Sequence, residues 1–494
     1  MMKLSELATL VIGAKIEGDD TVDIREAQVD SRLVKPGDLF ICLPGATVDG
    51  HDYIEQAVES GAVAVVVQRP VETTVAKLVV SDVRFAMAVI ACHLYGYPTK
   101  QLKVIGVTGT NGKTTTTHLL DTILRDAGYR TGLMGTIGLR IGDTFLEAKN
   151  TTQDALDLQR SFKQMVDVGT DYALIEVSSH ALAMGRVKGV QFRSALFSNL
   201  TQDHLDYHGT MEAYQAAKRL LFARMNNGYE ADEGRRQYAV INIDDAAGVD
   251  YAAATPAHLI TYAIDQPADV RATNIQITAQ GTRFRCETFV GTIDMQLKMI
   301  GKFNVYNALA AMAACLAEGV SLKAIAQSLA SVSGVDGRFE PVDEGQDFTV
   351  IVDYAHTPDS LQNVLSTIRE FADGRVICVF GCGGNRDRTK RPKMASIAAQ
   401  FSDYVIATSD NPRFEEPEAI LQDVEQGLLG TTTPYELIVE RGEAIGQAIA
   451  MAQTNDVILL AGKGHETYQE IRGTRLPSDD RELARTALRR REQR

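Results

Sequence analysis

Apolar residues occur along the chain in short runs separated by polar segments that contain glycine and proline. In the first hundred residues such runs lie at 39–42, 62–67 and 78–80. Short apolar runs bounded by turns predict buried strands in a small mixed α/β unit. The segment 96–100 has turn chemistry, and its proline disfavours helix in the residue before it. We therefore expect a first domain of residues 1–100.

The hydrophobic pattern changes in the next part of the chain. An apolar run at 103–107 predicts a buried strand, and apolar residues at helical spacing predict a helix over 113–127. Further strand candidates, separated by helical stretches, lie at 172–177, 194–197 and 238–243. This alternation predicts a parallel sheet built from βαβ units in a central domain of residues 101–334.

The last third of the chain repeats one arrangement four times. Each copy is an apolar strand candidate that runs into a polar or glycine-rich loop, and the four strands lie at 350–352, 376–380, 404–407 and 457–460. Loops after the carboxyl ends of parallel strands form the ligand crevice of an open α/β sheet. The pattern predicts an α/β fold with three domains, the last being residues 335–494 with a binding edge made of four loops.

Composition and charge narrow the class of protein. The 494 residues are 45% hydrophobic and 23% charged, as in globular proteins, and the length suits about three domains. A formal net charge of −14 argues against broad binding to nucleic acid or to anionic membranes. The six scattered cysteines fit no zinc pattern, and no signal peptide or long apolar run is evident. We expect a cytoplasmic protein with no nucleic-acid partner and no membrane partner.

The segment 109–115, Gly-Thr-Asn-Gly-Lys-Thr-Thr, carries the strongest chemical signal. It lies between a predicted strand and a predicted helix, where backbone N–H groups and the helix amino terminus can hold phosphate oxygens. Lys113 would reach the outer phosphates, and the Thr114 hydroxyl would coordinate Mg²⁺. The strict phosphate-loop pattern would place glycine where this chain has Val107. The alternative is a tight turn with a solvated lysine, but the motif in this context favours ATP or GTP binding.

Acidic and histidine side chains follow two further strands of the predicted central sheet. Glu176 lies near the end of one strand, where a carboxylate could hold Mg²⁺ beside the phosphate loop. The segment 199–208 contains two histidines and two aspartates, and Lys218 lies on the helix predicted over 211–222 that follows. Each histidine alone is more often a packing or surface residue than a ligand, but their density in one segment favours a site.

Together these motifs resemble the Mur ligases, a family of ATP-dependent amide-forming enzymes of peptidoglycan precursor synthesis. The resemblance covers nearly the whole chain. Its main motifs lie at 30–32, 35–40, 109–115, 176–180, 203–209, 301–307, 337–340 and 353–358. It implies a first domain that grips the UDP end of the substrate, a central P-loop ATPase domain, and a Rossmann-like last domain that brings the amino acid. It also implies that ATP phosphorylates the substrate carboxylate and that an amine then attacks the acyl phosphate.

The resemblance assigns roles to individual residues. Lys218 matches a lysine that is carbamylated and becomes an oxygen ligand for a second Mg²⁺, and Glu176 and His204 match its metal-binding partners. With Thr114 these form the expected metal set, and the expected catalytic residues are Lys113, Lys218, His204 and Glu176. The expected nucleotide contacts are Gly109, Thr110, Asn111, Gly112, Lys113, Thr114, Thr115, Asn304 and Arg338. The positions that match contacts to the UDP-muramoyl-dipeptide are Ser31, Asn150, Thr151, Thr152, Ser178 and Arg186. Met184 stands where the family often has glutamine.

The last domain carries the residues that the resemblance connects with amino-acid choice. The segment Asp410-Asn411-Pro412-Arg413 is similar to the family's signature for meso-diaminopimelate, whose second carboxylate needs a cationic fork that Arg413 and Arg386 could supply. Gly462 and Glu466 match further contacts, and Glu466 suits an ammonium group. The resemblance thus implies a ligase that adds meso-diaminopimelate to UDP-N-acetylmuramoyl-L-alanyl-D-glutamate. The alternatives are the same ligase using L-lysine, a ligase like folylpolyglutamate synthetase, and a nucleotide-binding switch without ligase chemistry.

Overall fold

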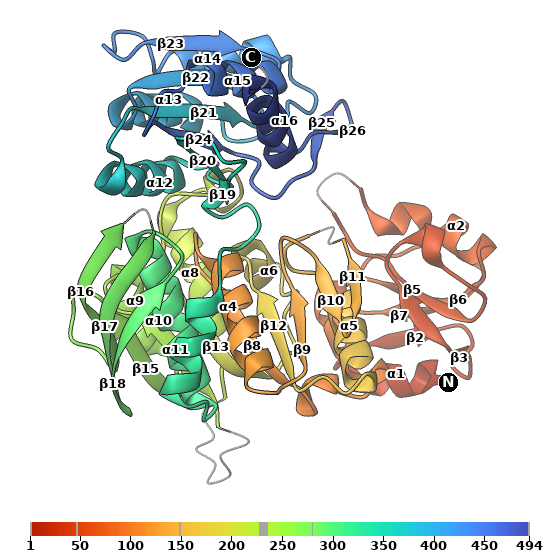
Figure 1. The fold of residues 1–494 in the computed structure, drawn as a ribbon. Coiled ribbons are helices and arrows are strands. Elements are labelled where there is room, and N and C mark those ends of the chain that lie inside the picture. Colours follow the sequence, from red (N-terminus) through yellow and green to blue (C-terminus); the bar gives the residue numbers. More distant parts are fainter. Residues whose placement is uncertain (1, 46–47, 148–149, 227–235, 279, 493–494) are drawn as a thin grey trace.

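Three large sheets follow one another along the chain. The computed structural model describes residues 2–45, 48–147, 150–226, 236–278 and 280–492. Figure 1 shows the first sheet in red, the central sheet from orange to green, and the third sheet from teal to blue. The chain changes sheet between residues 79 and 103 and again between 297 and 340. The predicted α/β class is confirmed, whereas the exact domain boundaries at 100 and 334 stay predictions.

The first sheet has five strands and contains the three that the sequence predicts. Its order is β2 (Lys15–Glu17), β7 (Ala76–Val79), β6 (Ala62–Val67), β5 (Asp38–Ile41) and β4 (Glu26–Gln28), with only β2 antiparallel. Helices α1 (Leu4–Leu10) and α3 (Val83–Leu94) pack in one apolar cluster with this sheet, and α2 (Ile54–Glu59) packs in another. Short elements complete the region: β1 (Met2–Lys3), β3 (Asp23–Ile24), and the 3₁₀ turns η1 (Ser31–Leu33), η2 (Gly50–Tyr53) and η3 (Pro98–Lys100).

The central sheet is larger than predicted and is mixed at its edges. Its eleven strands are, in order, β11 (Thr144–Leu146), β10 (Leu139–Ile141), β9 (Thr131–Met134), β12 (Tyr172–Glu176), β8 (Lys103–Thr108), β13 (Phe192–Phe197), β14 (Tyr238–Asn242), β15 (His258–Ala263), β16 (Val270–Thr278), β17 (Gly281–Thr288) and β18 (Gly291–Leu297). The pairs from β9 to β16 are parallel, as predicted, but β10, β11, β17 and β18 are antiparallel. Buried and exposed residues alternate along β17, because an antiparallel edge needs only one covered face.

Helices cover both faces of the parallel part of the central sheet. One face carries α4 (Lys113–Asp126), α10 (Lys302–Ala317) and α11 (Leu322–Ser331), which share an apolar cluster. The other carries α5 (Ala155–Asp167), α6 (Ser179–Ala183), α8 (Met211–Ala223) and α9 (Ala246–Ala254). The short helix α7 (Leu205–His208) precedes α8. The helices predicted over 113–127 and 211–222 are confirmed.

The third sheet brings the four predicted strand ends to one edge. Its order is β19 (Glu340–Val342), β20 (Thr349–Asp353), β24 (Val457–Ala461), β21 (Val376–Cys382), β22 (Tyr404–Ser409) and β23 (Tyr435–Ile438). All pairs except β19 with β20 are parallel. One face packs against α12 (Pro358–Phe371), α13 (Lys390–Phe401) and α14 (Pro417–Glu425), the other against α15 (Arg441–Met451) and α16 (Asp480–Glu492). A hairpin of β25 (Tyr468–Ile471) and β26 (Thr474–Pro477) follows β24.

The described part of the chain contains no disulfide and no helix that could span a membrane. Its six cysteines are free and buried. No helix among the described residues combines the length and the apolar character that crossing a membrane requires.

A buried ion-pair network joins the end of α10 to the central sheet. The Glu318 side chain is fully buried and accepts hydrogen bonds from Arg193 Nε at 2.5 Å, Lys103 Nζ at 2.9 Å and Tyr172 Oη at 2.8 Å. Burial opposes ionisation, but the hydrogen bonds and charges of Arg193 and Lys103 outweigh it and lower the pKa of Glu318. Glu318 is therefore an anion at neutral pH.

We expect Glu318→Gln to lower the free energy of unfolding at pH 7 by about 3 kcal/mol, because it removes the carboxylate that a buried guanidinium faces. A lowered folded pKa means that this stabilisation is present above the unfolded pKa and is lost as pH falls through the folded pKa. Urea unfolding should therefore show a difference between wild type and variant that shrinks below about pH 4. The exposed Glu287 on β17 gives the control, since Glu287→Gln should change stability by less than about 0.5 kcal/mol. Equal effects of the two variants would contradict the assignment.

Candidate functional site

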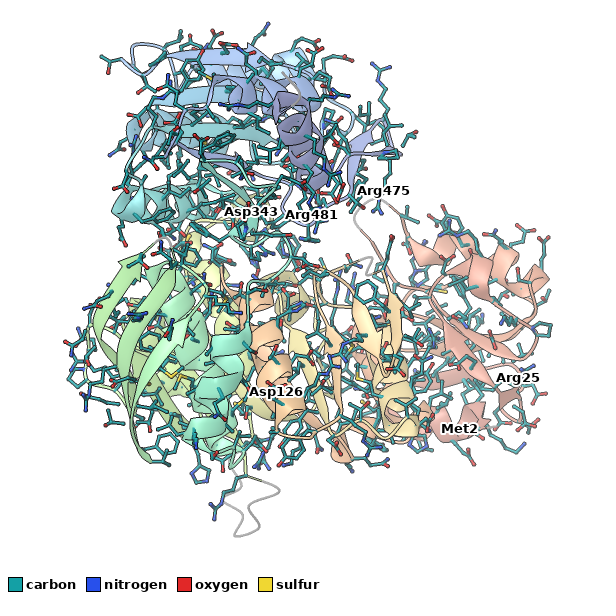
Figure 2. All side chains as sticks on the ribbon, in the orientation of Figure 1. Met2, Arg25, Asp126, Asp343, Arg475 and Arg481 are labelled. Carbon is teal, nitrogen blue, oxygen red and sulfur yellow. The ribbon has the colours of Figure 1, made fainter. Side chains whose placement is uncertain are left out.

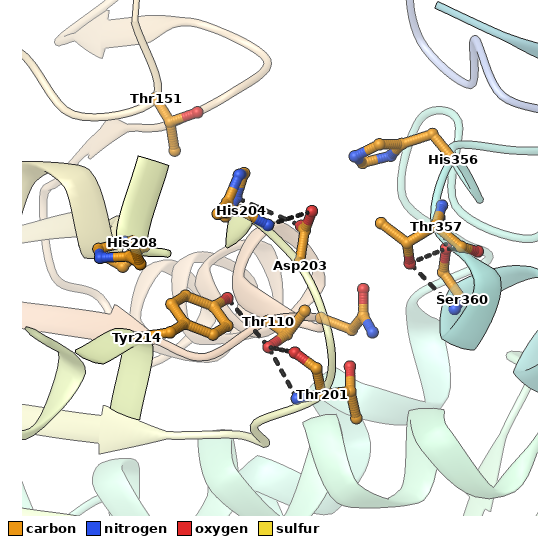
Figure 3. A network of polar contacts seen from close by, with 12 residues as sticks. Thr110, Thr151, Thr201, Asp203, His204, His208, Tyr214, His356, Thr357 and Ser360 are labelled. Carbon is orange, nitrogen blue, oxygen red and sulfur yellow. Dashed lines mark hydrogen bonds and ion pairs between the residues drawn. The ribbon is translucent and has the colours of Figure 1, made fainter. Parts of the chain in front are cut away.

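A cavity of about 760 Å³ lies where strands of the central and third sheets end. Segments after β8, β12, β13 and β14 line it from the central sheet, and the segment after β20 with the start of α12 lines it from the third sheet. We call the parts of the chain that contain the first, central and third sheets the first, central and third regions. Figure 3 shows His356, Thr357 and Ser360 of the third region opposite Asp203 and His204 of the central region. Parallel strand ends are the usual place for a ligand crevice.

The phosphate loop adopts its predicted position between β8 and α4. Gly112 has φ of +86° and immediately precedes the helix, and a Cβ there would lie 2.3 Å from Asn307 Oδ1. Gly109 has φ of +151°, and a Cβ there would lie 1.9 Å from Ser198 Oγ. Val107, where the strict pattern has glycine, belongs to β8 and is buried in the core. The departure from the pattern therefore falls in the strand, outside the turn that needs glycine.

Two lysine amines surround the Gly109 carbonyl. Lys113 Nζ donates to Gly109 O at 2.9 Å and to Thr110 O at 2.7 Å, and Lys218 Nζ donates to Gly109 O at 2.7 Å. Lys218 is 1% exposed and stands 4.7 Å from the centre of the Tyr214 ring. Among the described residues neither amine has a carboxylate within ion-pair distance. Burial lowers the pKa of both lysines, and for Lys218 the charge of Lys113 adds to this effect.

The chemistry of this donor set fits a polyphosphate. Arg338 reaches the same region, where its Nη2 donates to Thr114 Oγ1 at 3.2 Å. Its Nε is buried and has no hydrogen-bond acceptor among the described residues. Cationic donors that lack carboxylate partners in the described ranges, beside a helix amino terminus, favour an anionic ligand.

Thr110 holds the loop together. Its hydroxyl lies 3.1 Å from Tyr214 Oη on α8 and accepts from Thr201 N at 3.0 Å, as Figure 3 shows. The side chain thus connects the phosphate loop to two other segments that line the cavity.

The expected metal ligands line the cavity but do not form a complete site by themselves. Glu176 accepts from Thr136 N at 2.8 Å and from Thr136 Oγ1 at 3.0 Å. His204 lies 3.3 Å from Asp203, and burial lowers the pKa of its imidazole, which favours the neutral form that can bind a metal. Within the described ranges no three His, Cys, Asp or Glu side chains gather as a metal site. A Mg²⁺ site here would need further oxygen atoms, and the prediction stays untested.

The structure places most predicted substrate and nucleotide residues on this one cavity. Those that line it are Thr110, Asn111, Gly112, Lys113, Thr114, Thr115, Asn150, Thr151, Thr152, Glu176, Ser178, Arg186, His204, Lys218, Arg338 and Arg386. Three of the predicted nucleotide and dipeptide contacts, Gly109, Ser31 and Asn304, are not part of the cavity lining, and the predicted amino-acid contacts at 410–413, 462 and 466 lie in a second cluster. Ser31 follows β4 in the first region and donates to Gln56 Oε1 at 2.7 Å, and Asn304 accepts from Asn307 Nδ2 at 3.2 Å. Met184 also lines the cavity, and its sulfur accepts from Arg186 Nη2 at 3.6 Å. All these binding roles stay predictions.

Sequence reasoning missed two residues that line the cavity, and one of them connects its two sides. Asp359, at the start of α12, accepts from Asn111 Nδ2 at 2.8 Å and from Thr201 Oγ1 at 3.0 Å. The phosphate loop is thus hydrogen-bonded to the third region. Asn307, on α10, lines the cavity one turn after Asn304. Asn307 stands in the motif at 301–307, which was a usable signal, whereas nothing in the local pattern around Asp359 indicates a contact 248 residues away.

The residues predicted to choose the amino acid gather after β22 and β24. Asn411 Nδ2 donates to Glu466 Oε2 at 2.8 Å, and a Cβ on Gly462 would lie 2.8 Å from Asp410 Oδ2. Arg413 and Arg386 flank Gly383, where a Cβ would lie 3.0 Å from Arg413 Nη1 and 3.9 Å from Arg386 Cγ. Since Arg386 lines the main cavity, this second cluster, which Pro412 completes, lies beside the first.

Three family models match successive parts of the chain. The model described as Mur ligase family, catalytic domain, matches residues 23–95. The Mur ligase middle domain matches 107–315, and the model described as Mur ligase, glutamate ligase domain, matches 337–464.

Relatives resemble the chain over its full length. The UDP-N-acetylmuramoyl-L-alanyl-D-glutamate–2,6-diaminopimelate ligase of Geobacillus thermodenitrificans is 54% identical over 490 residues, which cover 99% of this chain and all of the relative. The ligase of the same name from Listeria monocytogenes is 49% identical and covers 99% of both chains. A solved structure of a ligase of this name is 34% identical, with a TM-score of 0.68 and 99% of both chains covered.

More distant structures share the fold alone. MurF ligase from Thermotoga maritima, solved in complex with ADP, has a TM-score of 0.66 at 18% identity and covers 95% of this chain and 98% of its own. Sequence identity of about 50% over the full length, as with the two ligases above, establishes membership of the family. The chain belongs to the Mur ligases.

Proposed function

We propose that the protein is an ATP-dependent ligase that joins meso-diaminopimelate to UDP-N-acetylmuramoyl-L-alanyl-D-glutamate in peptidoglycan precursor synthesis, in the cytoplasm. The observation that carries this proposal is one cavity that is lined by the phosphate loop, by five of the six predicted dipeptide contacts and by Arg386 of the third region. The names of relatives about 50% identical over the whole chain support the same substrates. In this proposal residues 1–100 grip the UDP end, 101–334 bind ATP, and 335–494 bring the amino acid.

The first chemical step would take place at the phosphate loop. A carboxylate oxygen of the terminal glutamate attacks the γ-phosphorus of ATP, the bond to the ADP oxygen breaks, and an acyl phosphate forms. Lys113 and Arg338 would donate to phosphate oxygens. The backbone N–H groups of the loop and the amino terminus of α4 would bind the other phosphate groups of ATP. Positioning and charge neutralisation are the main contributions that a protein makes to such a step.

Thr114, Glu176, His204 and a modified Lys218 are the proposed Mg²⁺ ligands. Mg²⁺ prefers oxygen ligands and, when bound, neutralises phosphate charge. An amine is a poor ligand for it, but a carbamate offers two oxygen atoms. The carbamate forms when the neutral Lys218 amine attacks CO₂, an N–C bond forms and a proton is released. Burial of Lys218 favours the neutral amine that this reaction requires.

In the second step, the amino acid bound by the third region would react with the acyl phosphate formed at the phosphate loop. The free amine of diaminopimelate attacks the acyl carbon, the C–O bond to phosphate breaks, and the nitrogen loses a proton as the amide forms. Arg413 and Arg386 are proposed to bind the distal carboxylate, and Glu466 the distal ammonium group. L-Lysine lacks that carboxylate, so it would leave the two arginines without a ligand. No observation favours folate as substrate, since the likeness to folylpolyglutamate synthase is one of fold at 18% identity.

Phosphate release by the purified protein with ATP, Mg²⁺ and UDP-N-acetylmuramoyl-L-alanyl-D-glutamate tests the proposal. We expect release with meso-diaminopimelate and little with L-lysine or with no amino acid. Release with lysine alone would keep the ligase chemistry but overturn the proposed role of Arg413. Equal release in all three mixtures would indicate an uncoupled ATPase and favour the nucleotide-binding switch.

A further inference from the structure

The hairpin of β25 and β26 is bound along the loop of residues 410–413. Arg413 N donates to Glu470 O at 3.0 Å, and Arg472 N donates to Arg413 O at 2.7 Å, so that Arg413 pairs with Ile471 as in a parallel strand. Arg475, on the second strand of the hairpin, lies at the side of the third region that faces the rest of the molecule (Figure 2).

Side chains fix the other end of the same loop to the same strand. Gln469 Nε2 donates to Asp410 O at 2.6 Å, and Asn411 Oδ1 accepts from Glu470 N at 2.9 Å. The loop therefore has hydrogen bonds to β25 at both of its ends. A loop tied in this way keeps one conformation more firmly than a loop exposed to solvent.

Arg413 itself adopts a backbone conformation that needs this support. Its φ is +52°, which costs a residue other than glycine on the order of 1–2 kcal/mol. Its side chain is held from two directions. Nε forms an ion pair with Glu470 Oε2 at 3.3 Å, and Nη1 donates to Gly384 O at 2.8 Å. Both side chains are mostly covered, with exposed fractions of 21% for Arg413 and 29% for Glu470.

We propose that Glu470 is a positioning residue that determines the preference for diaminopimelate by fixing the guanidinium of Arg413. This rests on the proposed function. A guanidinium binds a carboxylate best through two parallel N–H bonds, and these require its plane to be fixed before the ligand arrives. Glu470 faces Nε, and Gly384 O accepts from one N–H of Nη1, so the second N–H of Nη1 and those of Nη2 remain for a bidentate contact with a carboxylate. Without Glu470 the side chain would have more rotamers to lose on binding.

The pair also has a consequence for the choice between the two amino acids. When Arg413 is present, the charge of Glu470 is compensated at 3.3 Å. When Arg413 is removed, Glu470 loses this cation, and its negative charge adds to that of Glu466, the proposed contact of the ammonium group. The Glu470 backbone N–H and the Glu466 carboxylate contact the same Asn411 side chain. Glu470 should therefore support diaminopimelate in the wild type and lysine in an Arg413 variant.

The test is a double-mutant cycle on the full-length protein, with KM and kcat for both amino acids and KM for ATP. For Glu470→Ala we expect KM for diaminopimelate to rise about tenfold, as for the loss of one close ion pair between neighbouring side chains, with kcat and KM for ATP within about twofold. Glu470→Gln should recover part of this loss, because its amide oxygen can still face Arg413 Nε and limit the rotamers of the guanidinium. In the Arg413→Ala background, Glu470→Ala should change KM for diaminopimelate less than about twofold but reduce the use of lysine.

The neighbouring carboxylate Glu416 provides the matched control. It forms an exposed ion pair with Arg472 on the same hairpin, and Glu416→Gln should leave all constants unchanged. An equal loss from Glu470→Ala with and without Arg413, or a rise in KM for ATP as large as that for diaminopimelate, would overturn the proposal. Failure of the proposed function is distinguishable, because the wild-type protein would then not use diaminopimelate at all.

Discussion

Replacing Arg413 with alanine should lower kcat/KM for meso-diaminopimelate about 100-fold, with KM for ATP unchanged. The guanidinium is the group that the proposal places on the distal carboxylate, and loss of a buried, bidentate charge pair costs about 2–5 kcal/mol. Arg386 lies on the other side of Gly383 and would retain part of the attraction. L-Lysine should lose little, since it has no second carboxylate. Steady-state phosphate release with each amino acid measures the change in preference.

The control for Arg413 is another arginine of the third region. Arg388 forms an exposed ion pair with Asp423 at 2.8 Å, and it does not line the cavity among the described residues. Arg388→Ala should leave the preference unchanged. If diaminopimelate is used equally well after Arg413→Ala, the proposed basis of amino-acid choice is wrong, whereas the assignment of the fold and of the phosphate loop is unaffected.

The fold was predictable where the sequence had a strong period. The buried strands β6, β8 and β21 read as apolar runs because parallel strands are covered on both faces. The strands β10, β11, β17 and β18 were not predicted. They are short or one-sided strands at the sheet edges, and many of their residues point to solvent. Local pattern does not distinguish such strands from polar loops, since what fixes them is pairing with a neighbour.

The site was predictable where chemistry and chain position coincide. Glycines and a lysine between a strand and a helix are enough to predict the phosphate loop. The contact between Asn111 and Asp359, and the ion pair between Arg413 and Glu470, depend on how distant segments meet. No spacing within one segment encodes such contacts. Family resemblance indicated residues that are expected to contact the substrates, but it indicated none of the residues that hold those side chains in position.

Replacing Lys218 with alanine should reduce kcat about 1,000-fold, the scale of losing a major electrostatic contribution to the transition state. Lys218 is buried beside the phosphate loop. Within the described residues its amine contacts the Gly109 carbonyl oxygen and the Tyr214 ring and has no carboxylate partner. The described histidines and carboxylates alone do not form a complete metal site. A carbamate on Lys218 would supply further oxygen ligands for Mg²⁺. Formate or acetate should therefore restore part of the activity of Lys218→Ala, because either acid can place a carboxylate in the vacated space.

The replacement Lys218→Arg separates a carbamate from a simple cation. Arginine keeps the positive charge but does not form the carbamate, so we expect this variant to be as inactive as alanine and not to respond to formate. The intact mass of gently handled wild-type protein should show the addition of one CO₂ that neither variant shows. Arg219, the next residue on α8, forms an ion pair with Asp250 at the surface, and Arg219→Ala should keep full activity. Full activity of Lys218→Arg would mean that the side chain acts as a cation. The oxygen ligand for the second Mg²⁺ would then have to come from another residue.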